Sequence, residues 1–273
     1  MKVDIFNKIV TAIFRAFFYP LKELGDFCGL LILSGLTGFV MLIIFKKVSN
    51  QAGILAIKNR IKAHLLAIRL YKHDGVLSLR VMGHIFIENG RYFLYALKPT
   101  LVMMIPVAII IIQLSARYGY NTAEVGKSIL VSVKADDSVD LNEISLTASS
   151  GIRIDMPPIF IPSTHEINWR IYALESGIST LTFQHEQERE QKKIVADERG
   201  ELLSAKRVRS SLIGFLYPTE RKLAHNSFLK EISVGYSENI LQLAGFRIHW
   251  LVFFILTFVA IGFLAKKLFR VHI

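Results

Sequence analysis

The sequence predicts a membrane protein that combines three transmembrane α-helices with an all-β domain outside the bilayer. Of its 273 residues 52% are hydrophobic, and three blocks, at 27–45, 99–116 and 248–265, contain no Asp, Glu, Lys or Arg. Each block approaches the about 20 helical residues that cross a hydrocarbon core of roughly 30 Å. Backbone groups in hydrocarbon must bond to one another, so each block is expected to be a helix. Between the second and third blocks, alternating apolar and polar residues predict β-strands.

The distribution of charge orients the expected spans, which we place at 25–46, 92–117 and 246–266. The net charge of +11 alone could suggest a nucleic-acid partner, but it is not evenly spread. Residues 46–93 hold nine Lys or Arg against two acidic residues, whereas residues 117–247 hold 16 basic and 17 acidic ones. Because basic loops stay on the cytoplasmic side, the region 47–91 and the tail 267–273 are expected in the cytoplasm. The N-terminus and the β domain are then expected on the periplasmic or extracellular side of the cell (inner) membrane.

Residues 1–24 predict an amphipathic helix that lies in the membrane interface. Phe6, Ile9 and Ile13 fall on one side of such a helix, and Lys8 and Arg15 fall on the other. A helix that packs on a partner subunit is the alternative. The segment lacks the continuous apolar stretch and the cleavage site of a secretory signal.

Residues 47–91 are expected to form a basic helical hairpin. Ile54, Ile61 and Ile68 recur every seven residues, which indicates a short coiled-coil seam. His73-Asp74-Gly75 is expected to end the first helix, and Asn89-Gly90 to break the second.

Residues 121–240 predict a sandwich of about seven short antiparallel strands. Apolar and polar residues alternate near 129–134, 144–147, 152–154, 167–173, 181–183 and 230–236, with turn residues between these stretches. This set fits an immunoglobulin-like or fibronectin-like sandwich with Trp169 as its large core aromatic. The charged stretch 184–209 is expected to form a solvated turn and sheet edge.

The sequence lacks the motifs of common enzyme classes: it has no G-x-S-x-G, H-E-x-x-H, P-loop or C-x-x-C. Its eight histidines are scattered without metal-ligand spacing, and Cys28, the single cysteine, cannot form a disulfide within the chain. We therefore expect no enzymatic activity, no cofactor and no metal site.

Polar residues in the first span are candidates for function, because each is costly in hydrocarbon unless it is paired. Ser34 and Thr37 lie beside Gly29, Gly35 and Gly38. This pattern favours either close helix packing or one wall of a polar groove.

The second span holds three further polar candidates, Lys98, Thr100 and Gln113. Lys98 is near the cytoplasmic edge, where its ammonium group can reach the headgroups. Pro99 and Pro106 are expected to kink this helix, since proline removes one hydrogen bond of the ladder.

The stretch 46–120, with KKVSNQAGILAIKNRIKAHLLAIRLYKHDG followed by LKPTLVMMIPVAIIIIQL, resembles the Oxa/YidC-type insertase superfamily. The likeness lies in the layout: an outside N-terminus, a first span, a basic cytoplasmic hairpin and a proline-containing second span. It implies a polar groove that eases the hydrophilic end of a substrate across the membrane. The residues that would line this groove are Ser34, Thr37, Lys98, Thr100 and Gln113. Through NWRIYALESG and HWLVFFILTF the chain also resembles a group of bacterial membrane proteins that carry an external β domain.

Two functions are compatible with these features. In the first, the protein assists insertion or assembly of membrane proteins, and its basic hairpin meets a ribosome or a nascent chain. In the second, it is a structural or accessory subunit of an envelope complex, and its β domain binds a protein partner outside. A receptor or sensor ranks third, because no cytoplasmic signalling domain is expected. The basic residues that would make the cytoplasmic contact are Lys46, Lys47, Lys58, Arg60, Lys62 and Arg69.

Overall fold

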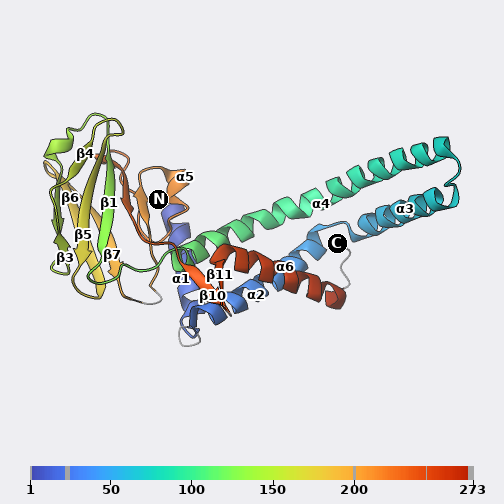
Figure 1. Cartoon of the computed structure of the whole chain (residues 1–273), viewed down its shortest axis with the longest axis horizontal. Helices are drawn as coiled ribbons and strands as arrows, with labels where there is room; N and C mark the ends of the chain where they lie inside the picture. Colours follow the sequence, from blue (N-terminus) through green and yellow to red (C-terminus); the bar gives the residue numbers. More distant parts are fainter. Residues whose placement is uncertain (1, 22–24, 199–200, 244, 270–273) are drawn as a thin grey trace. The chain divides into compact units, whose positions relative to one another are not determined.

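The computed structural model describes residues 2–21, 25–198, 201–243 and 245–269, which belong to two units (Figure 1). One unit falls within residues 1–29 and 111–250 and contains helix α1 (Lys2–Phe18) and the β-strands. The other falls within residues 30–110 and 251–273 and is helical. The expected combination of a helical part with a β domain is therefore confirmed.

The helical unit is built from α3 (Gln51–Leu70) and from most of three longer apolar helices, α2 (Gly25–Val48), α4 (Gly75–Tyr118) and α6 (Trp250–Phe269). Among the described residues two helices are long and apolar enough to cross a membrane, α2 with 24 residues and α4 with 44. The apolar part of α6, Trp250–Lys266, is shorter. By length and composition, then, α2 and α4 are candidate spans.

Helix α4 is longer than the sequence indicated, because it continues through Asn89-Gly90. The predicted break there is wrong, and no break separates 47–91 from 92–117. The Asn89 amide donates to the carbonyl oxygen of Ile85 at 2.9 Å, so this side chain bonds within the helix rather than against it. One glycine costs a helix only about 1 kcal/mol. Pro99 and Pro106 also lie inside α4, and neither ends it.

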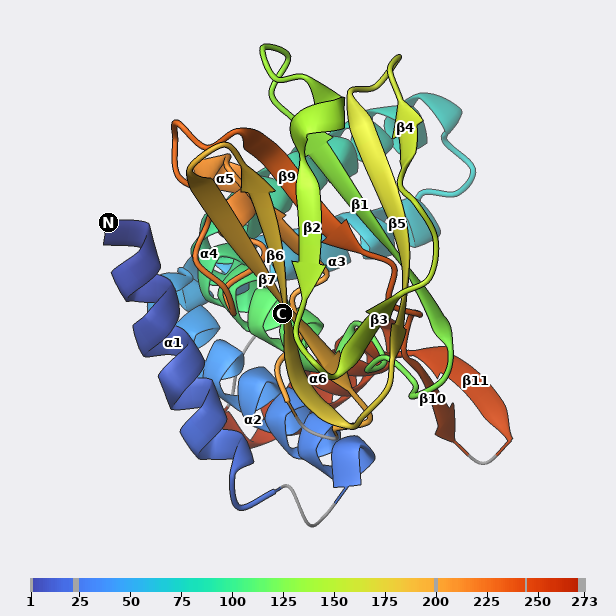
Figure 2. The same ribbon diagram turned by 90° about the vertical axis from the view of Figure 1, so that its left-hand side faces the viewer.

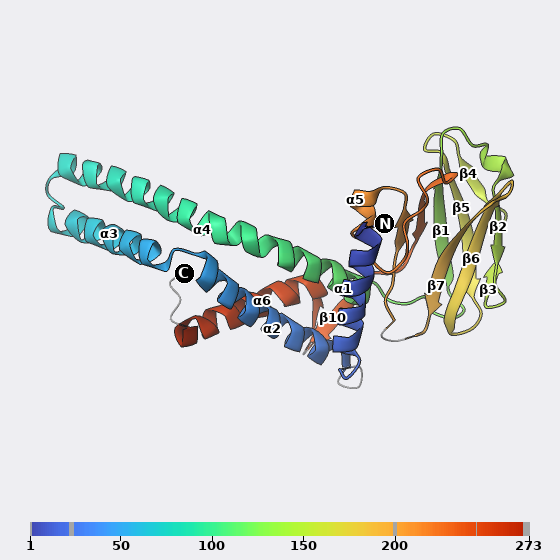
Figure 3. The ribbon, with the colours of Figure 1, turned by 180° about the vertical axis from the view of Figure 1, so that it is seen from behind.

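The turn predicted at His73-Asp74-Gly75 is confirmed, since α3 ends at Leu70 and α4 begins at Gly75. The carboxylate of Asp74 accepts a hydrogen bond from the backbone N–H of Leu77 at 2.9 Å, which satisfies one free donor of the first turn. α3 and the first part of α4 lie side by side as a helical hairpin (Figure 3).

Small residues allow α2 to approach α6 closely. A Cβ atom added at Gly38 would lie 2.7 Å from the carbonyl oxygen of Phe258, and one at Gly35 would lie 2.9 Å from Cδ1 of Ile261. Any larger residue at position 38 would therefore clash with the backbone of α6. This contact agrees with the helix-packing alternative for the first span.

The larger sheet of the β domain is antiparallel and has the strand order β3-β5-β1-β9-β8, with β4 also paired to β5 (Figure 2). Its central strand places Val131 opposite Trp169 on one side and Val234 on the other. The strands are β1 (Ser128–Ala135), β3 (Ile152–Ile154), β4 (Ile159–Ile161), β5 (Glu166–Ala173), β8 (Lys206–Val208) and β9 (Leu229–Val234).

The second sheet has the order β2-β6-β7, formed by β2 (Ser145–Ala148), β6 (Gly177–His185) and β7 (Glu188–Ala196). Alternate residues of both sheets enter one apolar core, because side chains of a strand point to opposite faces in turn. The ring of Trp169 lies 5.6 Å from that of Phe183 across this core, and Trp169 is only 3% exposed. The prediction that Trp169 is the large core aromatic is confirmed.

Two sequence predictions near the β domain need correction. The stretch 184–209 does form sheet edges, because β7 and β8 are edge strands. It is not solvated throughout, however, since Ile194 of β7 is completely buried. The third apolar helix does not begin at 246, because β10 (Ile240–Leu243) and β11 (Phe246–His249) form an antiparallel hairpin and α6 starts at Trp250. Of the expected tail 267–273, residues 267–269 belong to α6, and 270–273 lie outside the described residues.

Helix α1 has the length and the two-sided character expected for residues 1–24, of which 1 and 22–24 lie outside the described part. Asn7 and Phe18 are buried, whereas Ile5, Ile9 and Ile13 are 51%, 56% and 61% exposed. The edge of the apolar side that Ile5, Ile9 and Ile13 form is therefore uncovered, whereas Val10, Phe14 and Phe17 are partly buried.

We predict that Gly38→Ala destabilises the helical unit and that Gly262→Ala does not. The added methyl at Gly38 meets a backbone carbonyl that cannot move independently, and forced overpacking costs about 1–3 kcal/mol. At Gly262 a Cβ atom meets nothing within 4 Å, so this variant is the matched control. The measurement is thermal unfolding of the full chain in detergent, and equal midpoints for the two variants would contradict the α2–α6 contact.

Candidate functional site

The polar residues expected in the first span are buried and bond to their own helix. The Ser34 hydroxyl donates to the Leu30 carbonyl oxygen at 2.6 Å, and the Thr37 hydroxyl donates to that of Leu33 at 2.7 Å. Ser34 is fully buried and Thr37 is 3% exposed. Both hydroxyl donors are thus satisfied one turn back in α2.

The polar residues expected in the second span lie in different surroundings. Lys98 and Thr100 are exposed, and the Thr100 hydroxyl donates to the Ala96 carbonyl oxygen at 2.8 Å. Gln113 belongs to the unit of the β domain, where it is buried and its Oε1 accepts a hydrogen bond from Thr11 of α1 at 3.3 Å. The five residues thus differ in burial, because Ser34, Thr37 and Gln113 are buried and Lys98 and Thr100 are exposed.

The two proline positions also differ from each other. Pro99 is buried and Pro106 is partly buried. Each removes one backbone donor from α4. A kink at either position stays a prediction.

The basic residues of the hairpin are largely available to a partner. Lys58 is partly buried, with its ammonium group 5.7 Å from the centre of the Tyr92 ring, a cation–π contact. The exposed basic residues are Lys46, Lys47, Arg60, Lys62 and Arg69.

A buried carboxylate joins the two arms of the hairpin. Glu88 of α4 is 6% exposed, and its Oε1 lies 2.6 Å from Nη1 of Arg91 and 3.6 Å from Nη1 of Arg60 on α3. The rings of His64 and His84 stack across the same interface, with centroids 5.6 Å apart. These contacts extend the expected seam, in which Ile54 and Ile57 are buried while Ile61 and Ile68 are half-buried.

The side of α4 that faces away from α3 is an uncovered apolar stripe. Its members recur at three- and four-residue intervals, which places them on one face of the helix. The large side chains are strongly exposed, for example Phe86 at 73% and Phe93 at 63%. A Cβ atom at Gly83 or Gly90 would meet nothing within 4 Å, so open notches alternate with the projecting rings. The α4 stripe consists of Val76, Leu79, Gly83, Phe86, Gly90, Phe93, Leu97, Leu101 and Met104.

The α4 stripe leads from the hairpin into the apolar half of the helix. Its first members flank the charged residues Arg80 and Arg91, and its last members, Leu101 and Met104, lie within the uncharged block 99–116. From Val76 to Met104 it extends over 28 residue steps, about 42 Å at 1.5 Å per residue. The α4 stripe therefore connects the basic hairpin to the uncharged block of α4, which is part of a candidate span.

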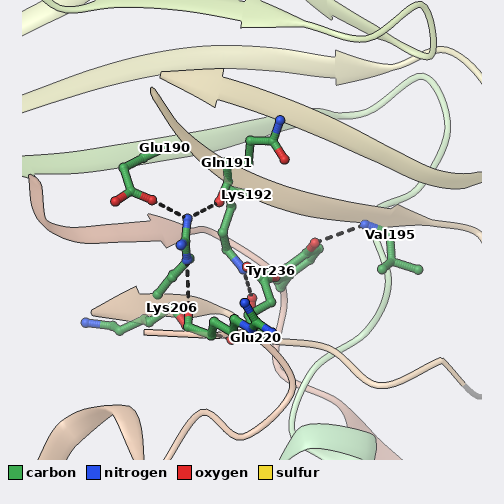
Figure 4. A network of polar contacts seen from close by, with 10 residues as sticks. Glu190, Gln191, Lys192, Val195, Lys206, Glu220 and Tyr236 are labelled. Atoms are coloured by element: carbon green, nitrogen blue, oxygen red, sulfur yellow. Dashed lines mark hydrogen bonds and ion pairs between the residues drawn. The ribbon is translucent and has the colours of Figure 1, made fainter. Parts of the chain in front are cut away.

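A second concentration of polar contacts lies inside the β domain (Figure 4). Lys192 of β7 is completely buried, and its ammonium group donates to the Ser204 carbonyl oxygen at 2.6 Å and to Glu220 at 2.7 Å. Burial lowers the pKa of Lys192, while the Glu220 carboxylate acts in the opposite direction. The sequence analysis expected a solvated edge here and missed the burial of Lys192. The signal for this burial was Ile194, which lies two residues further along and therefore shares the inward face of the strand.

Further contacts hold the segment after β8 against the strands. Arg207 donates to the carbonyl oxygens of Gln191 at 2.5 Å and Arg221 at 2.7 Å, and pairs with Glu190 at 2.8 Å. The Tyr236 hydroxyl accepts a hydrogen bond from the backbone N–H of Val195, and burial raises the pKa of Tyr236 to about 12. The arrangement fixes the backbone near 220–221.

Within the described residues, no group of three His, Cys, Asp or Glu side chains could hold a metal ion. No family model, curated protein or solved structure matches the chain.

We predict that Glu220→Gln destabilises the β domain by about 3–5 kcal/mol, because it leaves a buried ammonium ion without its counter-charge. The double variant Lys192→Met/Glu220→Gln is expected to recover most of this loss, since an apolar side chain then fills the site. Thermal unfolding of the full chain measures both.

The partly exposed pair of Lys206 and Glu231, 2.6 Å apart with side chains 41% and 31% exposed, is the control. Glu231→Gln is expected to cost less than about 1 kcal/mol. A Glu220→Gln effect no larger than that of Glu231→Gln would contradict the role of the buried pair.

Proposed function

We propose that the protein is an insertase-like membrane protein that guides apolar helices of other membrane proteins from the cytoplasm into the bilayer. The observation that carries this proposal is the α4 stripe, which is apolar, uncovered and continuous from the basic hairpin to the uncharged part of α4. An exposed apolar surface of this extent is typical of an interaction site.

The proposed topology has three spans, α2, α4 and α6, with the β domain outside and the hairpin in the cytoplasm. The excess of basic residues in 46–93 supports this orientation. The uncharged block of α4 accounts for about 27 Å of hydrocarbon, and the rest of the helix from Gly75 to Lys98 extends about 36 Å beyond it. We place the protein in the cell (inner) membrane with the β domain, of proposed immunoglobulin-like or fibronectin-like fold, on the periplasmic or extracellular side.

The proposed occupant of the α4 stripe is an apolar α-helix. Rings at Phe86 and Phe93 can pack into the grooves of such a helix, and the notches at Gly83 and Gly90 allow its backbone to come close. The basic residues along the hairpin, such as Lys62 and Arg69, would hold a nascent chain or ribosome by charge. This role is the one implied by the resemblance to Oxa/YidC-type insertases, and it requires no enzymatic step and no cofactor.

A second candidate function is a structural or accessory subunit of an envelope membrane complex, with a protein partner on the β domain. The packing of α2 favours it, because Ser34 and Thr37 bond to their own helix and Gly35 and Gly38 are used against α6. In that case α2 only anchors, and the α4 stripe binds one permanent partner helix.

We predict that a photo-reactive residue at Phe86 cross-links to short-tailed nascent membrane proteins during their synthesis. Arg80 is also exposed on α4 but lies outside the stripe, so the same probe at Arg80 is expected to give at least several-fold less product. The product is measured by gel analysis of ribosome-bound chains of a single-span substrate. Phe86→Asp is expected to slow insertion of the same substrate, because a carboxylate on the stripe repels an apolar helix.

Three outcomes are informative. Equal cross-linking at Phe86 and Arg80 would contradict the stripe as the binding face. A single stoichiometric product that persists without protein synthesis would favour the accessory subunit. Unchanged insertion after depletion of the protein would rule out the insertase role.

A further inference from the structure

A basic cavity lies between helix α1 and the segment that follows β8. Its volume is about 420 Å³, and α1 contributes Ile5 and Lys8 to its wall. The polar part of the remaining wall is formed by Arg209, Ser211, Arg221, Lys222 and His225. The lining thus contains four Lys or Arg side chains and a histidine, and none of the described side chains that line it is a carboxylate.

The charges around this cavity are only partly compensated. Arg209 pairs with Asp136 at 2.6 Å, and this contact lowers the pKa of the Asp136 carboxyl. Lys222 donates to the hydroxyl of Ser211 at 2.6 Å, a neutral partner that leaves its charge in place. Lys8 and Arg221 are exposed at the cavity. The cavity is therefore suited to an anion.

The wall that carries Arg221 and Lys222 is fixed by the polar contacts described above. Arg207 donates to the carbonyl oxygen of Arg221, and the backbone N–H of Leu223 donates to Val208 of β8 at 3.0 Å. The preceding residue, Glu220, is held by buried Lys192. A binding site on a fixed wall loses less conformational entropy when a ligand binds.

The chain around α1 indicates where the anion would come from. The exposed stripe Ile5, Ile9 and Ile13 begins at the cavity itself and continues along α1. The chain then enters α2, a candidate span, at Gly25. A helix with an uncovered apolar stripe and basic flanks, one short connection from a span, is typical of one that lies in the headgroup layer.

We propose that this cavity binds the phosphate group of an anionic phospholipid headgroup. Lys8, Arg221 and Lys222 hold the phosphate oxygens through charge-assisted hydrogen bonds. The acyl chains extend over the isoleucine stripe of α1. The inference rests on the membrane location proposed above, but not on the function of the hairpin. A soluble phosphate ester has the same chemistry, and the experiment separates the two sources.

The test titrates the full chain, in a neutral detergent, separately with short-chain phosphatidylglycerol, short-chain phosphatidylcholine and inorganic phosphate. The affinity for each ligand is measured by calorimetry. Phosphatidylglycerol is expected to bind about tenfold or more tightly than phosphatidylcholine. The double variant Arg221→Gln/Lys222→Gln should weaken it by about tenfold or more, since two charge-assisted bonds are lost. Lys127→Gln/Arg153→Gln removes the same charge from β-domain residues outside the cavity and should leave the affinity unchanged.

Two further variants keep the test decisive. Lys8→Gln changes an exposed residue of α1 and is expected to weaken phosphatidylglycerol binding without loss of folding. Ile9→Ser/Ile13→Ser should weaken the lipid but not inorganic phosphate.

The proposal is overturned if Arg221→Gln/Lys222→Gln and Lys127→Gln/Arg153→Gln have equal effects, or if the two lipids bind equally. Binding of inorganic phosphate alone, with the same dependence on Arg221 and Lys222, would overturn the lipid as the source. Failure of the Phe86 cross-link does not alter any of these outcomes, so the two proposals can fail separately.

Discussion

The continuity of α4 over its whole length is the constraint on which the proposed function depends. Because the helix does not stop at Asn89-Gly90 or at its two prolines, one face persists from Val76 to Met104. A break at any of these points would rotate the following residues and interrupt the stripe. Each proline still removes a donor, so the carbonyl groups one turn earlier lose their usual partner. The helix tolerates this loss over 44 residues.

Burial of charge serves two distinct purposes in the two units. In the hairpin, Glu88 receives Arg60 from the opposite arm and Arg91 from its own, so a carboxylate between two helices sets how they pair. In the β domain, Lys192 and Glu220 attach a long connection to a strand that otherwise belongs to the core. In both cases, removal of one partner of the ion pair would leave the other charge in a poorly solvated site. Arrangements that separate the two partners are therefore disfavoured, so these contacts select one way of packing as well as stabilising it.

Much of the fold could be predicted because apolar periodicity reports burial directly. Blocks without charge located α2, the C-terminal part of α4 and most of α6, and alternation located β1, β5 and β9. The burial of one face of β7 was missed because Lys192 occupies an inward position, where its charge concealed the alternation that Ile194 continues. The start of α6 was misplaced because the apolar residues Phe246 and Ile248 are compatible with either a strand or a helix. Only the pairing of this segment with β10 shows that it is a strand.

The candidate site was less accessible to sequence reasoning. Ser34 and Thr37 were recognised as polar residues in an apolar block, but their hydrogen bonds to Leu30 and Leu33 depend on rotamers that a pattern does not contain. The spacing of Val76, Leu79 and Phe86 in the sequence already places them on one face of a helix. That it stays uncovered, and that Gly83 and Gly90 open notches in it, required the positions of the neighbouring helices.

The absence of side chains at Gly83 and Gly90 has a consequence for selectivity. A surface whose recesses are formed by bare backbone makes few demands on the size or order of the side chains that enter them. Its rings supply van der Waals contact without directional hydrogen bonds, so many unrelated helices would fit with similar energy. In the proposed role, such a surface would favour a helical apolar segment over an extended one, and the sequences of its partners could then diverge freely.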